Sequence, residues 1–114
     1  MRFWSVLGVS LGSAAFAGAP VVENVTVVEL SNKLRFNVTI SHADEGWDHY
    51  ADGWGVYAPD GRELGYRVLA HPHVEEQPFT RSLTINRPEG LSSVIIRPRD
   101  SVHGEGADYT VPLP

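Results

Sequence analysis

The chain has 114 residues, with 9 Lys or Arg, 14 Asp or Glu, a formal net charge of −5 and no Cys. This length predicts one domain, and the acidic balance argues against a nucleic-acid-binding protein, because affinity for phosphate comes from clustered Lys and Arg. The absence of Cys excludes disulfides, thiolate metal sites and a Cys nucleophile.

The first 17 residues are typical of a secretory signal peptide. Met1-Arg2 gives a positive start, residues 3–11 are mostly apolar, and Ala15-Phe16-Ala17 has the small-x-small form of a signal-peptidase site. The apolar run is too short to span a bilayer, and no Cys follows it to carry a bacterial lipid anchor. We therefore expect an exported protein, periplasmic or extracellular, whose single domain covers residues 18–114 and has no membrane span.

Seven short strands follow in chain order. Residues 33–40 show the clearest signal, because apolar and polar side chains alternate along them as in a half-buried strand. Pro98 inside the sixth strand predicts an edge position or a bulge, since proline cannot donate to the ladder. The expected strands are 21–30, 33–40, 54–57, 64–69, 79–85, 94–99 and 109–113. This pattern predicts an all-β fold, a seven-stranded antiparallel sandwich of the immunoglobulin or fibronectin-type-III kind.

The connections between these strands differ in composition at the two ends of the sandwich. Antiparallel strands reverse at each connection, so the second, fourth and sixth connections (41–53, 70–78 and 100–108) share one end. They contain all five histidines, nine of the 14 acids and no Lys or Arg. The histidines are His42, His49, His71, His73 and His103. A bound cation would offset the repulsion among the acids, and the alternative is a solvated acidic rim screened by salt.

The segment His71-Pro72-His73 has the spacing of a chelating pair. Proline holds the preceding residue extended, and residues two apart in an extended chain point the same way. Imidazole suits Zn, Cu and Fe, and nearby carboxylates such as Glu75 and Glu76 would orient the rings. The alternative is that these histidines are surface residues with a pH-dependent charge. We predict a transition-metal site among the five histidines.

Several short segments resemble the superoxide reductase family, the catalytic domain of desulfoferrodoxin and neelaredoxin. The matching segments are Pro20-Val21-Val22-Glu23, Ile40-Ser41-His42, Asp48-His49-Tyr50, Trp54-Gly55-Val56-Tyr57 and Asp100-Ser101-Val102-His103-Gly104. The resemblance implies a seven-stranded immunoglobulin-like sandwich whose metal ligands at one end include His42, His49 and His103. Asp100 stands where the family has its axial Cys, and no His precedes Pro20 in the mature chain. Asp100 is therefore a candidate extra ligand or supporting carboxylate, and His71 and His73 are candidates to replace missing ligands.

Three functions are compatible with these patterns. The leading one is an exported protein that binds Cu, Zn or Fe for delivery, buffering or redox protection. The second is a non-metal interaction module that binds another exported protein through the long loops, with Trp47, Tyr50 and Trp54 as contact residues. The third is a divergent superoxide reductase. Outside that third case we expect no enzyme, because Ser41 and Ser101 lack the strained turn of a catalytic nucleophile.

Overall fold

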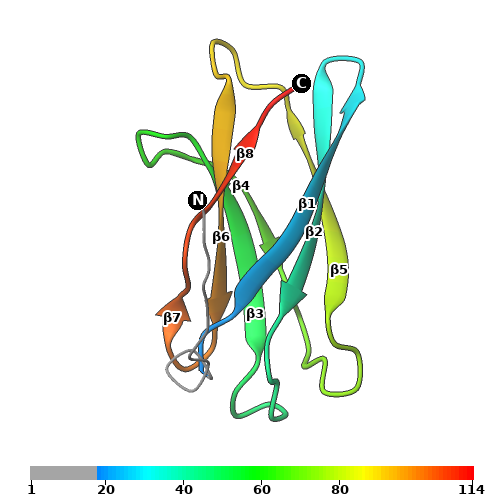
Figure 1. Ribbon diagram of the computed structural model, residues 1–114, viewed down its shortest axis with the longest axis vertical. Helices are drawn as coiled ribbons and strands as arrows, with labels where there is room; N and C mark the ends of the chain where they lie inside the picture. The colour runs from blue at the N-terminus through cyan, green and yellow to red at the C-terminus, as the bar shows by residue number, and fades with distance from the viewer. Residues whose placement is uncertain (1–17) are drawn as a thin grey trace, which may run out of the picture.

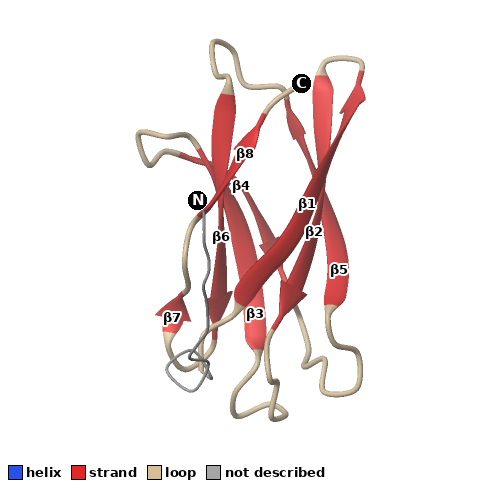
Figure 2. Ribbon diagram, in the orientation of Figure 1, coloured by secondary structure: helices blue, strands red, loops and turns tan. Residues whose placement is uncertain are grey.

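The computed structural model describes residues 18–114, so the expected signal peptide lies outside the described residues. Within them the chain forms eight strands and no helix, and thus contains no helix able to cross a membrane (Figure 2). The strands are β1 (Val21–Leu30), β2 (Lys33–Ser41), β3 (Ala51–Tyr57), β4 (Glu63–Val68), β5 (Phe79–Asn86), β6 (Ser93–Asp100), β7 (Gly104–Glu105) and β8 (Tyr109–Pro112). The expected all-β class is confirmed.

Two antiparallel sheets form the layers of a sandwich (Figure 1). One sheet has the order β1-β2-β5, and the other has the order β4-β3-β6, with both β7 and β8 paired to β6. Every pairing is antiparallel. The expected sandwich of antiparallel sheets is confirmed. Its assignment to the immunoglobulin or fibronectin-type-III kind stays a prediction.

The expected number of seven strands is wrong because it omits β7. This strand has only two residues, Gly104 and Glu105, which pair with Asp100 and Arg99 of β6. Gly104 has a positive φ of 78°, a conformation that glycine adopts without steric cost and that turns the chain back onto β6. A two-residue strand has no alternating hydrophobic pattern, so the sequence carries no signal for it.

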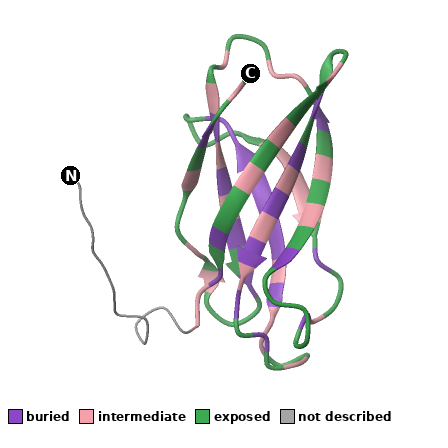
Figure 3. Cartoon of the chain, turned by 45° about the vertical axis from the view of Figure 1, so that its right-hand side comes forward, coloured by how far each residue is buried: buried purple, intermediate pink, exposed green. Residues whose placement is uncertain are grey.

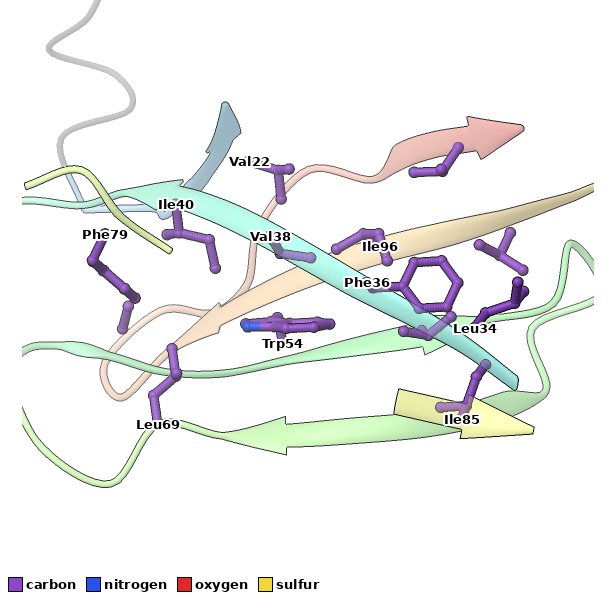
Figure 4. Close-up of a cluster of buried hydrophobic side chains, with 14 residues drawn as sticks. Val22, Leu34, Phe36, Val38, Ile40, Trp54, Leu69, Phe79, Ile85 and Ile96 are labelled. Atoms are coloured by element: carbon purple, nitrogen blue, oxygen red, sulfur yellow. The ribbon is translucent and has the colours of Figure 1, made fainter. Parts of the chain in front are cut away.

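The core lies between the sheets and is centred on β2. Leu34, Phe36, Val38 and Ile40 are completely buried, as their alternation predicts (Figure 4). The facing sheet contributes completely buried side chains from β3 and β6, including Trp54, Val56, Val94 and Ile96. Figure 3 shows the resulting alternation of buried and exposed residues along the strands. Burying each large side chain contributes roughly 1.5–3 kcal/mol, so this core provides a stable base for the loops.

Pro98 lies in an internal strand, so the edge position is wrong, while the alternative of a bulge agrees with the register shift of β3 on β6 between Ala51 and Gly53, beside the Trp54–Pro98 pair. β6 pairs with β3 on one side and with β8 and β7 on the other. The pairing with β8 covers residues 93–96 and that with β7 covers residues 99–100, so Pro98 falls in the gap between them. Its carbonyl accepts a hydrogen bond from the N–H of Gly106. In this gap no ladder hydrogen bond requires the N–H that proline lacks.

The long connections meet at one end of the sandwich. The β2–β3, β4–β5 and β6–β7 connections and the start of β1 all lie at the lower end of the view in Figure 1. Backbone hydrogen bonds join two of these connections, since the N–H of Ser101 donates to the carbonyl of Tyr50. The antiparallel topology therefore brings the histidine-bearing loops together, as strand parity predicts.

Candidate metal centre

Three imidazoles converge on one carboxylate oxygen at this end. Oδ2 of Asp100 lies 3.0 Å from Nε2 of His42, 2.9 Å from Nε2 of His49 and 2.9 Å from Nδ1 of His103. Single ligand atoms of His42, His49 and Asp100 all lie within 4.8 Å of one another, a spacing that suits a shared metal ion. His103 reaches the same oxygen but lies outside that closest group. The structure thus brings together three of the five predicted histidines and the predicted extra ligand Asp100.

Asp100 is held in place by the turn that follows it. It is the last residue of β6 and is completely buried. Its Oδ1 accepts hydrogen bonds from the backbone N–H groups of Val102 and His103, which leaves Oδ2 for the imidazoles. Burial opposes ionisation of Asp100, but the hydrogen bonds from His103, His49 and His42 outweigh it and hold the pKa well below its usual range. Asp100 is therefore a carboxylate at neutral pH.

Two further carboxylates orient the histidine rings. Nδ1 of His42 lies 2.5 Å from Oδ1 of Asp44, and Nδ1 of His49 lies 2.8 Å from Oε1 of Glu45. Because an ionised carboxylate only accepts hydrogen bonds, Asp44 and Glu45 favour a proton on each Nδ1, and each Nε2 is directed at Asp100. A carboxylate on the second ring nitrogen is the usual support of an imidazole that binds metal.

His49 favours its protonated form in this setting. The hydrogen bond to Glu45 and the one to Asp100 raise the pKa of His49 to about 9. Its side chain is only 14% exposed, and it packs against its neighbours, with ring centroids 4.9 Å from His42 and 5.0 Å from His103. The proton on His49 therefore offsets part of the cluster's negative charge.

Asp44 joins two of the loops. Its side chain is completely buried, and besides His42 it accepts hydrogen bonds from the backbone N–H of Ala51 and the backbone N–H of His73, at 3.1 and 2.7 Å. One carboxylate thus fixes the ring of His42, the start of β3 and the β4–β5 connection. From the sequence, Asp44 and Glu45 were expected only to add to the acidic charge of this end. Their spacing could have indicated contacts with the histidines, because Asp44 follows His42 by two residues and Glu45 precedes His49 by four.

His71 and His73 lie apart from the convergent group. His73 is buried, and its ring stacks on Phe79 with centroids 3.9 Å apart and an interplanar angle of 9°. Burial, and next the nearby charge of Arg81, lower the pKa of His73, so it is neutral at pH 7. His71 is exposed, with its ring centroid 5.0 Å from that of His73. Two side chains link this segment to the cluster. Oδ2 of Asp44 is 3.5 Å from Nδ1 of His73, and the Gln77 amide accepts a hydrogen bond from the N–H of His42 and donates one to the carbonyl of His73.

The acidic end is less negative than its loop sequences suggest. Four of the nine acids pair with Arg side chains of β5 and β6, which reach along the strands into this end. These pairs are Glu76 with Arg81, Glu105 and Asp108 with Arg97, and Asp52 with Arg99. Glu75 is exposed, and Glu76 is engaged by Arg81. The carboxylates that support the rings are instead Asp44 and Glu45.

The three aromatic residues expected to form one contact surface lie in different environments. Trp47 is 69% exposed and makes an edge contact with Tyr50, with ring centroids 5.7 Å apart. Trp54 is completely buried on β3, so its assignment to an interaction loop is wrong. The inward direction of β3 at this position, opposite the β2 core residues, decides its placement.

Gly18, which the sequence reasoning treated only as the start of the mature chain, lies in the cluster. Its carbonyl oxygen is 3.2 Å from Nε2 of His42 and 3.2 Å from Nε2 of His49. No motif in the sequence indicates this contact. It arises because β1 begins opposite the end of β2, where Val21 pairs with Ser41.

The fold and the cluster define an all-β sandwich with a His/Asp group at one end, in which His42 and Asp100 are buried, His49 is partly buried and His103 is exposed. No family model matches the chain, and no solved structure matches it. One curated relative, from Halomicrobium mukohataei, carries the name "Putative lipoprotein". It is 46% identical over 78 residues, which make up 68% of this chain and 38% of that protein. The matched part thus spans well under half of the relative's length, and the resemblance to superoxide reductase stays a prediction.

Proposed function

We propose that this chain is an exported protein that binds one transition-metal ion, Cu, Zn or Fe, through His42, His49 and Asp100, with His103 as a fourth ligand. The observation that carries the proposal is the convergence of three ring nitrogens on Oδ2 of Asp100. Imidazole nitrogen with one carboxylate oxygen is a donor set that suits these ions.

The ion would replace the proton that His49 holds at Nε2. Nε2 of His49 would become a ligand on losing that proton, Nε2 of His42 faces the same oxygen, and Asp44 and Glu45 hold the two rings in place through Nδ1. Asp100 already carries the negative charge that a cation requires. Only small movements are needed, because ligand atoms 2.0–2.1 Å from one ion lie about 3–4 Å from each other.

The donor set favours metal binding over superoxide reduction. In the family that the chain resembles, an axial thiolate donates electron density to iron, and the resemblance puts Asp100 at the corresponding sequence position. A carboxylate is a harder and less electron-donating ligand than a thiolate. We therefore propose metal delivery or buffering as the role of the site, and the reductase activity remains the weaker alternative.

A location outside the cytoplasm agrees with two observations. The first 17 residues have the form of a secretory signal peptide, and the Halomicrobium relative is named as a lipoprotein. An exported or membrane-anchored setting fits a protein that handles metal ions arriving from outside the cell.

Metal titration tests the proposal. The processed chain should bind one ion of Zn(II) or Cu(II), and ligand at about 100 times Kd should stabilise it by about 2.7 kcal/mol, a rise in Tm of roughly 10–20 °C. His49→Ala should weaken binding at least 100-fold, whereas the matched control His71→Ala, an exposed histidine of the neighbouring loop, should change it less than twofold. The absence of any shift in Tm with Zn(II), Cu(II) or Fe(II) would overturn the proposal.

A second candidate rests on Trp47. A tryptophan that is 69% exposed beside the site is typical of a residue that contacts another protein. Trp47→Ala should leave the metal affinity unchanged while weakening transfer of the metal to or from an exported partner. Identical rates of metal transfer for the native chain and for Trp47→Ala would rule out this contact role of Trp47.

A further inference from the structure

Gly18 contacts every histidine of the convergent cluster. Its carbonyl oxygen is 3.2 Å from Nε2 of both His42 and His49. A Cβ at position 18 would lie 2.1 Å from Cε1 and 2.4 Å from Nε2 of His103, so the Gly18 Cα rests against the His103 ring. The first described residue therefore lies among the imidazoles, and this position has no room for a side chain unless His103 moves.

The sequence motif before Gly18 changes the chemistry of this residue. Ala15-Phe16-Ala17 predicts cleavage of the peptide bond between Ala17 and Gly18. Before cleavage the nitrogen of Gly18 belongs to an amide, whose lone pair is delocalised, so the nitrogen is a poor metal ligand while it keeps its proton. After cleavage the same nitrogen is a primary amine, which binds such ions as a neutral donor once its proton has left to solvent.

We propose that processing after Ala17 makes Gly18 a ligand of the metal centre, through its α-amine and its carbonyl oxygen. The nitrogen and oxygen of one terminal residue can close a five-membered ring on one ion, beside the imidazoles of His42 and His49. This inference rests on the proposed function, because it adds ligands to the same site.

The proposal makes metal loading depend on export. The precursor holds His42, His49, His103 and Asp100 but lacks the amine, so it binds the ion more weakly. The processed chain completes the ligand set only after the signal peptide is removed. Metal ions in the cytoplasm are thereby left to other proteins, and the site acquires its full affinity where the mature protein works.

Three forms of the chain test the role of the amine. The first begins at Gly18 with a free amine, the second begins at Gly18 with an N-acetyl group, and the third retains Ala17. The acetyl group removes the basic lone pair without adding a side chain, and equal Tm values without metal show that all three forms are folded. Each form is loaded with Cu(II) after growth with [¹⁵N]glycine, and its affinity and pulsed EPR spectrum are measured.

We expect the free-amine form to bind Cu(II) at least tenfold more tightly than the other two and to show a strong ¹⁵N coupling that they lack. Equal affinities without ¹⁵N coupling in the free-amine form would overturn the role of Gly18 and leave the His/Asp metal site intact. Failure of all three forms to bind Cu(II), Zn(II) or Fe(II) would overturn the proposed function itself. Loss of binding on His49→Ala in the free-amine form shows that the copper occupies the shared site and not the terminus alone.

Discussion

Asp100 shows how a buried charge is tolerated in this protein. A carboxylate removed from water is stable only if other groups donate to it, and here two backbone N–H groups and three imidazoles do so. The raised pKa of His49 has a related cause, since the hydrogen bond to Glu45 and next the one to Asp100 favour the protonated ring. The proposed ion would take the place of that proton.

Zinc binding should therefore depend strongly on pH. His49, with a pKa of about 9, is protonated at neutral pH and must lose that proton before Nε2 can bind an ion. We expect the zinc affinity to rise roughly tenfold per pH unit between pH 7 and pH 9, and Glu45→Gln to flatten this rise by lowering the pKa of His49. Competition with a chelator between pH 7 and pH 9 measures the zinc affinity. An affinity that stays constant over this pH range would contradict the assignment of His49 as a ligand.

Asp44 should matter to both stability and affinity. It is buried and accepts hydrogen bonds from His42, Ala51 and His73, so Asp44→Ala leaves buried donors without a partner. We expect a loss of about 2–4 kcal/mol in the free energy of unfolding and a 10–100-fold weaker metal affinity. Urea unfolding and zinc titration measure the two effects. Asp48→Ala, an exposed acid of the same loop, is the control and should change neither.

His73 should make the stability fall at mildly acidic pH. Burial holds its pKa below the ordinary value of 6.5, so the unfolded chain takes up a proton more readily than the folded one. Its contribution to stability is present above pH 6.5 and is lost as the pH falls toward the folded-state pKa. Urea unfolding at pH 7.5 and 5.5 should show a larger drop for the native chain than for His73→Gln. If His71→Gln reduced the drop as much, the explanation would fail, because His71 is exposed.

At the scale of elements, the strands with strict alternation were the most predictable. Residues 33–40 alternate, and β2 buries all four apolar side chains of that stretch. Phe36→Ala should therefore cost about 3–5 kcal/mol of unfolding free energy by leaving a cavity, whereas Arg35→Ala, on the exposed face of the same strand, should cost less than about 0.5 kcal/mol. Urea unfolding measures both. Similar losses for the two variants would mean that β2 does not face the core as described.

The elements that the sequence did not predict depend on long-range pairing. β7 exists because Gly104 turns the chain back onto β6, and Pro98 is accommodated because β7 and β8 leave a gap between them. Neither feature has a local hydrophobic pattern. The same reason explains Trp54, whose position near a long loop suggested exposure although the strand directs it into the core.

For the whole molecule, strand parity predicted which end carries the site but not which residues form it. Parity depends only on the order of antiparallel strands, so it placed the five histidines at one end correctly. The choice among them depends on side-chain directions across three loops, which brought His42, His49 and His103 onto Asp100 and turned His73 against Phe79. The contact of Gly18 with the cluster likewise requires the register of β1 on β2.

The distribution of charge over the folded chain differs from its distribution along the sequence. The loops at the histidine end carry nine acids and no base, yet Arg81, Arg97 and Arg99 reach several of those acids from the strands. Most of these pairs are exposed and contribute little to stability, typically 0–1 kcal/mol each. The acids of this end without an Arg partner are therefore those of the His/Asp cluster and the nearby loop tips, which is where a cation would be attracted.

A crystal structure of the processed chain loaded with Zn(II), with anomalous data at the zinc edge, tests the central claim most directly. The account predicts one ion at the histidine end, with bonds of about 2.0–2.2 Å to Nε2 of His42, Nε2 of His49 and a carboxylate oxygen of Asp100. An ion held by His71 and His73 instead, or no ion at stoichiometric zinc, would contradict it.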